Sequence, residues 1–261
     1  MKLLGMTLTE LKTLTKEMGL PSFTAKQMAD WLYKKRVTTI EDMTNLSMAN
    51  RSKLESACEV GIVSPERVQE SEDGTKKYLF KTNDSYIETV FIPEADRATL
   101  CVSTQIGCKM NCLFCMTGKQ GFSGDLTAAD ILNQMQAIPE YDRLTNVVFM
   151  GMGEPMDNVD AVLKSLEIMT SDYGYAWSPK RVTVSTVGLI PGLRRFLAES
   201  DCHLAVSLHN PIAEERRSIM PVQKAYPIES VLEEIKKYDF THQRRVSFEY
   251  IMFKDLNDTD N

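Results

Sequence analysis

The sequence of 261 residues lacks long apolar runs and lacks an excess of basic charge, and each absence argues against a class of protein. No stretch approaches the ~20 consecutive apolar residues that a membrane-spanning helix needs. The first residues, MKLLGMTLTELKTLTKEMGL, contain no apolar core of signal-peptide length. With a formal net charge of −6 the chain is not a strongly basic module, although a local basic face can still contact RNA. We therefore expect a cytoplasmic protein with no membrane attachment.

Cysteine is scarce, and half of it lies in one short segment. Of six cysteines, three fall in GCKMNCLFCM as Cys108, Cys112 and Cys115. Disulfide frameworks belong mainly to small secreted domains, so this pattern favours a metal or redox role. Structural zinc takes four ligands, usually as two pairs, and the sequence offers no second pair. Three thiolates on an iron–sulfur cubane leave one iron open to a ligand, which favours a cluster over zinc.

The first third of the chain changes from a helical to a strand pattern. Residues 1–60 have apolar residues at helical spacing, with a stop at Gly19 and with Thr24 and Gln27 placed as a capping box. Residues 61–97 contain two alternating segments, KKYLFKT and SYIETVFIP, joined by the turn residues TNDS. We predict a small helical N-terminal domain followed by a β-hairpin.

The remainder, residues 98–261, alternates strand-like and helical segments. The strand-like segments are ATLCVST, NVVFMGMGEP, RVTVSTVG, HLAVSLHN and RRVSFEYIMF. The helical segments are LTAADILNQMQAI, NVDAVLKSLEIMT, PGLRRFLAES and IESVLEEIKKY. This alternation predicts an α/β fold of parallel βα units, either a barrel or a doubly wound sheet. In barrels the working residues follow the strands, which is where the cysteine segment stands.

Polar and small residues follow the next three strands at the same expected edge. Gly153 lets the backbone approach a ligand, and Glu154 offers an acceptor to an ammonium group. Ser185, Ser207 and His209 add hydroxyl and imidazole groups. Alone, a short glycine motif is weak support for a site, and a strand-end histidine is more often simply satisfied by its neighbours.

The segment CKMNCLFC, with Phe114 before its last cysteine and a strand before it, resembles the CxxxCxxC signature of radical S-adenosylmethionine enzymes. ADRATLCVSTQIGC, NVVFMGMGEP, RVTVSTVG and LAVSLH are similar, in that order, to one subfamily, as are SFTAKQMADWLY and SEDGTKKYLF. That subfamily methylates C2 of adenine in ribosomal and transfer RNA, and its siblings methylate adenine C8. The resemblance covers nearly the whole chain. It implies a partial (β/α) radical-enzyme barrel over residues 98–261.

The resemblance also implies cofactors and site residues. A [4Fe–4S] cluster is expected on the three cysteines, with S-adenosylmethionine on its open iron. The expected contacts of S-adenosylmethionine are Gly153, Glu154, Ser185, Ser207, Leu208 and His209. Glu88 is expected to be the general base, and Cys101 the thiol that forms a disulfide to release the product. From the residues alone, Glu88 would be an exposed strand carboxylate and Cys101 a buried core thiol.

In the implied mechanism, one S-adenosylmethionine methylates a cysteine near the family's C-terminus and a second yields the radical that activates that methyl group. The sequence stops at FKDLNDTDN, before the family's sixth strand and that cysteine, so we expect a C-terminally truncated chain without turnover of its own. The expected partners are ribosomal and transfer RNA and a flavodoxin or ferredoxin, with the protein a monomer. Alternatives are an adenine-C8 methyltransferase, a non-catalytic iron–sulfur or zinc module, or a radical enzyme that acts on peptides or small molecules.

Overall fold

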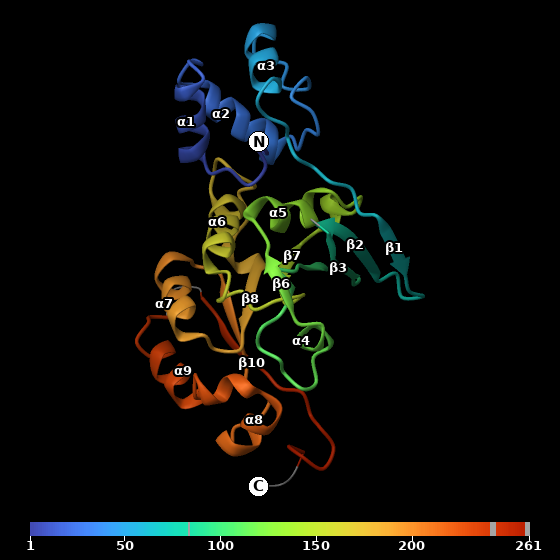
Figure 1. The fold of residues 1–261 in the computed structure, drawn as a ribbon, viewed down its shortest axis with the longest axis vertical. Helices are drawn as coiled ribbons and strands as arrows, with labels where there is room; N and C mark the ends of the chain where they lie inside the picture. Colours follow the sequence, from blue (N-terminus) through green and yellow to red (C-terminus); the bar gives the residue numbers. More distant parts are fainter. Residues whose placement is uncertain (83, 241–243, 259–261) are drawn as a thin grey trace.

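A single eight-stranded sheet forms the body of the protein in the computed structural model, which describes residues 1–82, 84–240 and 244–258 (Figure 1). Its strand order is β1-β2-β3-β4-β7-β8-β9-β10. The strands are β1 (Arg67–Glu70), β2 (Lys76–Thr82), β3 (Ser85–Pro93), β4 (Ala98–Cys101), β7 (Asn146–Phe149), β8 (Val182–Thr186), β9 (His203–Ser207) and β10 (Val246–Glu249). From β4 to β10 all neighbours run parallel, whereas β1 to β4 pair antiparallel. The predicted α/β class, with a hairpin and a partial barrel, is confirmed.

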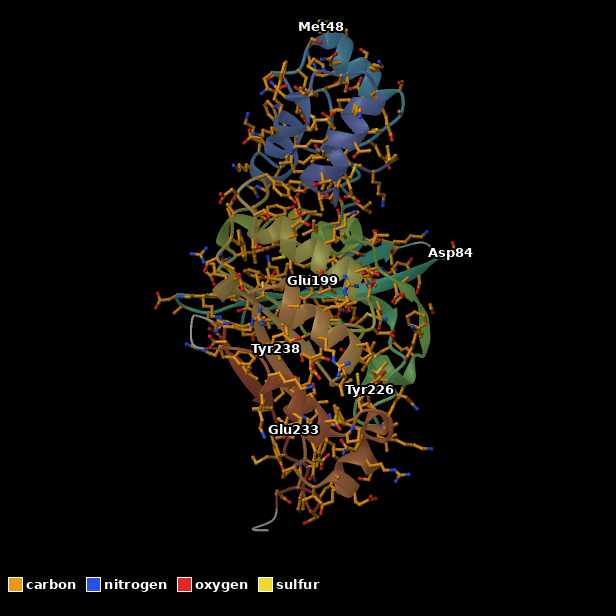
Figure 2. All side chains as sticks on the ribbon, turned by 90° about the vertical axis from the view of Figure 1, so that its left-hand side faces the viewer. Met48, Asp84, Glu199, Tyr226, Glu233 and Tyr238 are labelled. Carbon is orange, nitrogen blue, oxygen red and sulfur yellow. The ribbon has the colours of Figure 1, made fainter. Side chains whose placement is uncertain are left out.

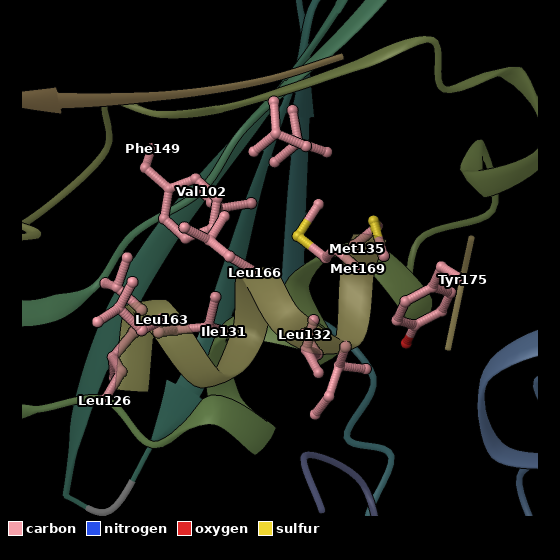
Figure 3. Close-up of a cluster of buried hydrophobic side chains, with 14 of the residues drawn as sticks. Val102, Leu126, Ile131, Leu132, Met135, Phe149, Leu163, Leu166, Met169 and Tyr175 are labelled. Atoms are coloured by element: carbon pink, nitrogen blue, oxygen red, sulfur yellow. The ribbon is translucent and has the colours of Figure 1, made fainter. Parts of the chain in front are cut away.

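Helices between the parallel strands cover the sheet. They are α5 (Ala128–Gln136), α6 (Val159–Thr170), α7 (Ile190–Glu199), α8 (Ala213–Ile219) and α9 (Ile228–Ile235), with short turns η2 (Tyr141–Arg143), η3 (Pro179–Arg181) and η4 (Pro221–Lys224). Figure 3 shows leucine, isoleucine and methionine side chains of α5 and α6 packed beside Phe149 of β7 and beside Val102, which directly follows β4. Burial of this apolar layer stabilises the βα units at roughly 25 cal/mol per Å² of area removed from water. Helix α8 was not predicted.

The N-terminal helices stand at one end of the sheet (Figure 1). They are α1 (Leu8–Glu17), α2 (Thr24–Ala29), the π-helical turn η1 (Asp30–Lys34) and α3 (Met48–Glu55). A capping box of Thr7 and Glu10 begins α1, and Gly19 follows its end with φ 61°. The capping box predicted at Thr24 is wrong. The backbone of the preceding Phe23 is already helical, so Thr24 lies inside the first turn, where its hydroxyl accepts no capping hydrogen bond.

Aromatic and ionic contacts join these helices to the barrel. The Tyr33 ring lies 5.4 Å from that of Tyr175, and the Tyr33 hydroxyl donates a hydrogen bond to the carbonyl of Met6. Lys164 of α6 pairs with Glu10 of α1 at 2.7 Å. Figure 2 shows Met48 of α3 far from Glu233 of α9, and Asp84 beside the turn of the β2–β3 hairpin at the side of the sheet.

No helix in the described ranges is long and apolar enough to cross a membrane.

Candidate active site

The three clustered cysteines lie in a loop that a small second sheet holds in place. Strands β5 (Gln105–Gly107) and β6 (Phe122–Asp125) pair antiparallel on either side of the loop and of the short helix α4 (Met116–Lys119). Gly107 has φ 79°, and a Cβ there would stand 1.8 Å from the carbonyl oxygen of Gly121. Only glycine fits so close an approach at positive φ. Cys108 then donates its N–H to the same Gly121 carbonyl at 2.8 Å, which fixes the start of the loop.

The loop closes one side of a cavity of about 210 Å³ at the C-terminal ends of β7 to β10. The cavity is lined by all three cysteines and by five of the six predicted contacts, namely Gly153, Glu154, Ser185, Ser207 and His209. Leu208, the sixth, is not part of the lining. Its N–H donates to the backbone carbonyl of Glu249 at 3.1 Å. The structure therefore brings together predicted residues from four separate segments of the sequence.

Burial disfavours ionisation of the loop thiols. Desolvation raises the pKa of Cys108 to about 11 and that of Cys112 to about 12. A cysteine thiol must lose its proton to bind iron as a thiolate. Uptake of a metal by this loop therefore releases protons. Among the described residues, no three His, Cys, Asp or Glu side chains are close enough together to hold a single metal ion. The three thiols thus surround the cavity without meeting at one point.

Glu154 ties the end of β7 to the end of β8. Its carboxylate accepts hydrogen bonds from Thr186 Oγ1 at 2.6 Å and from the N–H groups of Val187 and Met156, each at 3.0 Å. Full burial raises the pKa of Glu154 to about 7, although these three hydrogen bonds oppose the rise. Beside it, a Cβ on Gly153 would clash with Gln105 at 2.6 Å, so glycine is required there as well.

Glu249 is a site residue that the sequence did not reveal. It ends β10, and its Oε2 accepts hydrogen bonds from the hydroxyls of Ser185 and Ser207, at 2.8 Å each. One carboxylate thereby connects β8, β9 and β10. The predicted fifth strand ran on to Phe253, which placed Glu249 within the strand rather than at its end. The parallel register of Ser207 with Glu249 was the missing information.

His209 presents a neutral ring to the cysteine loop. Its backbone has φ 55°, a left-handed conformation that is uncommon for residues other than glycine. Burial lowers the pKa of His209. The ring packs edge-on against Phe114 with centroids 5.0 Å apart, and its Nδ1 accepts a hydrogen bond from the N–H of Ile251 at 3.3 Å. The loop and the end of β9 are therefore in direct contact.

The two remaining predicted residues lie outside the cavity lining. Cys101 ends β4, and burial raises the pKa of its thiol to about 11. The same thiol hydrogen-bonds the backbone of Met150 and feels the charge of Glu249, and both of these residues line the cavity. Glu88, on β3, is half-exposed and pairs with Lys77 at 3.0 Å.

No disulfide joins any of the six cysteines, all of which lie in the described ranges. The disulfide predicted at Cys101 is not supported, because every thiol is free and that of Cys101 is held protonated by its burial. Cys58 and Cys202 are buried among apolar side chains of the core.

Comparisons with known proteins agree along the whole chain. Residues 1–60 match the "Ribosomal RNA large subunit methyltransferase N-terminal domain" family, and residues 102–261 match the "Radical SAM superfamily". The chain is 63% identical over 259 residues to a "Probable dual-specificity RNA methyltransferase RlmN" of Parabacteroides distasonis, covering 99% of this chain and 76% of that protein. It is 40% identical over 256 residues to the "Dual-specificity RNA methyltransferase RlmN" of Geobacter sulfurreducens, covering 98% and 71%.

A solved structure gives the same picture. A radical SAM methyltransferase from Sphaerobacter thermophilus superposes with a TM-score of 0.91 at 37% identity, covering 100% of this chain and 79% of that one. The chain thus spans about three quarters of the length of the relatives it matches.

Proposed function

The chain belongs to the RlmN family of dual-specificity radical S-adenosylmethionine RNA methyltransferases, and we propose from this that it methylates C2 of adenine in large-subunit ribosomal RNA and in transfer RNA. The observation that best supports the proposal is the shared cavity. Three thiols with no fourth beside them face a ring of carboxylate, hydroxyl and imidazole groups from neighbouring parallel strands. A structural metal site has no need of such a ring, whereas a cofactor that must be oriented does.

The chemistry of the lining fits the family's two cofactors. Cys108, Cys112 and Cys115 would hold a [4Fe–4S] cluster through their thiolates and leave one iron for S-adenosylmethionine. Once bound, the reduced cluster supplies the electron that cleaves S-adenosylmethionine. Glu154 is fully buried and is poised between its charged and neutral forms, so a cationic ammonium group beside it would favour the carboxylate.

Three strands share the task of orienting the cofactor. Ser185 and Ser207 direct their hydroxyl hydrogens to Glu249, which leaves their oxygen lone pairs free to accept from ligand groups. His209, uncharged and packed on Phe114, closes the side next to the cysteine loop. We assign Gly153 to a backbone contact, because a glycine backbone can approach the ligand closely. Leu208 lies outside the lining, its N–H donates to Glu249 and its carbonyl accepts from Arg216, so we assign it no direct contact with the ligand.

Glu88 and Cys101 lie on adjacent strands, since Cys101 pairs with Val90, which is two residues along β3 from Glu88. We propose that adenine lies over β3 and β4, between these two residues and the cavity. Lys77 pairs with Glu88 at 3.0 Å and holds this carboxylate in place at the position we assign to the general base. Cys101 would act as a nucleophile only after losing its proton, because burial keeps the pKa of the thiol near 11.

Partners, location and domain division complete the proposal. The names of the relatives support RNA as substrate, and we propose a flavodoxin or ferredoxin as electron donor, a monomeric state and a cytoplasmic location. We propose residues 1–60 as a helical domain, 61–97 as a hairpin linker and 98–261 as the catalytic barrel. The two family matches, to residues 1–60 and 102–261, support that division.

Product mapping tests the function. The reconstituted chain, continued by the C-terminal segment of the Parabacteroides distasonis relative, is incubated without oxygen with reductant, S-adenosylmethionine and protein-free ribosomal or transfer RNA. Mass spectrometry of nuclease digests should find 2-methyladenine, and Glu88→Ala should abolish it while Glu94→Ala does not. Finding 8-methyladenine instead would move the chain to the sibling family. Unmodified RNA combined with active cleavage of S-adenosylmethionine would point to a substrate other than RNA.

A further inference from the structure

Arg216 of α8 is a buried cation that no sequence motif suggested. Its side chain is 0% exposed, and its guanidinium donates four hydrogen bonds to neutral oxygens. Three of the acceptors are the backbone carbonyls of Val187, Ser207 and Leu208, at 3.0, 2.9 and 3.0 Å. The fourth is the side-chain oxygen of Gln223, at 2.5 Å. One planar group thus holds the C-terminal ends of β8 and β9 together.

No carboxylate of the described residues is in contact with this buried charge. None of the ion pairs formed by the described residues includes Arg216, whereas Arg194 and Arg195 on α7 are both paired. Glu229 acts on it only as a charge at longer range. Burial of an unpaired cation is costly, and the cost shows as a lowered pKa of Arg216. A fold that keeps such a charge buried indicates that an anion belongs nearby.

The cysteine loop is the neighbour of this charge. The N–H of Leu113, directly after Cys112, donates to the carbonyl of Ile219 at 2.9 Å, and Ile219 lies three residues along α8 from Arg216. Cys112 of the loop and Met220, which directly follows Ile219, both line the cavity. Figure 1 shows α8 and α4, which follows the loop, at the same end of the sheet.

We propose that Arg216 is a positioning residue with two tasks: it is the buried counter-charge of the cluster, and it holds the ends of β8 and β9 beside it. The first task rests on the proposed function. A [4Fe–4S] core on three thiolates is anionic and gains one further negative charge when it accepts one electron from a reductant. A fixed cation therefore stabilises the reduced form more than the oxidised form, and the reduction potential is higher with Arg216 than without it.

Two substitutions separate the tasks, and a neighbour provides the control. Arg216→Gln removes the charge, and Arg216→Lys keeps the charge but cannot reach three carbonyls with one planar fork. Arg217→Gln removes the same charge from the exposed face of the same helix. Each protein is reconstituted without oxygen and titrated with dithionite, and the reduced cluster is followed by EPR. Affinity for S-adenosylmethionine is measured by calorimetry.

We expect a more negative midpoint potential for Arg216→Gln, and potentials like the parent's for Arg216→Lys and Arg217→Gln. S-adenosylmethionine should bind more weakly to both Arg216 variants. A midpoint potential in Arg216→Gln equal to the parent's would overturn the proposal that Arg216 is the counter-charge of the cluster. If Arg216→Gln does not fold, the test rests on Arg216→Lys, which keeps the positive charge. A midpoint potential like the parent's in Arg216→Lys supports the inference, and a potential well below the parent's overturns it. A parent chain that takes up no iron would instead refute the proposed function.

Discussion

The carboxylate of Glu249 links the hydroxyls of Ser185 and Ser207, so its removal should loosen the cofactor cavity at two strands together. Each hydrogen bond is 2.8 Å long, and each serine is only 8% exposed. In Glu249→Ala, two nearly buried hydroxyls lose a charged acceptor, and water has little access to replace it. A hydrogen bond to a charged group contributes roughly 1.5–3 kcal/mol.

We expect Glu249→Ala to weaken the free energy of S-adenosylmethionine binding by about the contribution of one such hydrogen bond. The second hydroxyl can turn to the ligand and recover part of its loss. This corresponds to roughly a 10- to 100-fold rise in Kd, at about 1.4 kcal/mol per tenfold change. Glu249→Gln keeps an acceptor oxygen and loses only the charge, so its effect should be smaller. The assay is anaerobic calorimetry on the reconstituted protein, with thermal unfolding of the iron-free chain measured in parallel.

Glu233→Ala is the matched control, because Glu233 lies on α9 and pairs with Lys236 in an exposed ion pair. Such pairs contribute about 0–1 kcal/mol to stability, so this variant should bind and unfold like the parent. Parent-like affinity in Glu249→Ala as well would refute the reasoning. The carboxylate bridge would then be a feature of the fold with no part in orienting the cofactor.

Three further predictions follow from single contacts. Burial raises the pKa of Glu154 to about 7 from its ordinary 4.5, so the parent should lose stability as pH rises from about 4.5 to 7, by on the order of 3 kcal/mol. Urea unfolding at several pH values measures this loss, and in Glu154→Gln the stability should change little over that range. Gly107→Ala should weaken iron retention, because the new Cβ would stand 1.8 Å from the carbonyl oxygen of Gly121. Gly121→Ala is the control: Gly121 has a similar φ, but a Cβ there has no atom within 4 Å, so this variant should cost only backbone strain. Leu166→Ala should cost about 2–5 kcal/mol by calorimetric unfolding, whereas Val68→Ala at an exposed position should cost little.

Features that depend on residues close together in the sequence could be predicted from it. Cys108, Cys112 and Cys115 lie within one loop, so their spacing alone indicated a shared ligand, and the structure places them around one cavity. Ser185, Ser207 and His209 were predicted at strand ends, and the structure places them in one cavity lining, because parallel strands bring their C-terminal ends to a common edge. Strands β2 and β3 were predicted at their observed bounds, since alternation and turn residues are both local signals.

Contacts between distant segments could not be predicted in this way. Glu249 meets its two serines across 64 and 42 residues of sequence, and only the register of β9 with β10 brings them together. Arg216 lies on a helix of seven residues, and three of its four acceptors are backbone carbonyls, which leave no mark in a sequence. Thr24 failed as a helix cap because the turn at Phe23 had already begun the helix, and a sequence pattern cannot show that offset.

The central claim is that the loop of Cys108, Cys112 and Cys115 holds an iron–sulfur cluster in the cavity, and iron counting with EPR after anaerobic reconstitution tests it most directly. The parent and Cys202→Ala should each bind about four irons and give the signal of a reduced [4Fe–4S] cluster that changes when S-adenosylmethionine is added, while Cys115→Ala should lose both. Cys202 is a suitable control because it is a free cysteine buried in the core, away from the cavity lining. A colourless parent that binds one zinc, or a Cys115→Ala variant that keeps its iron and its signal, would contradict the account.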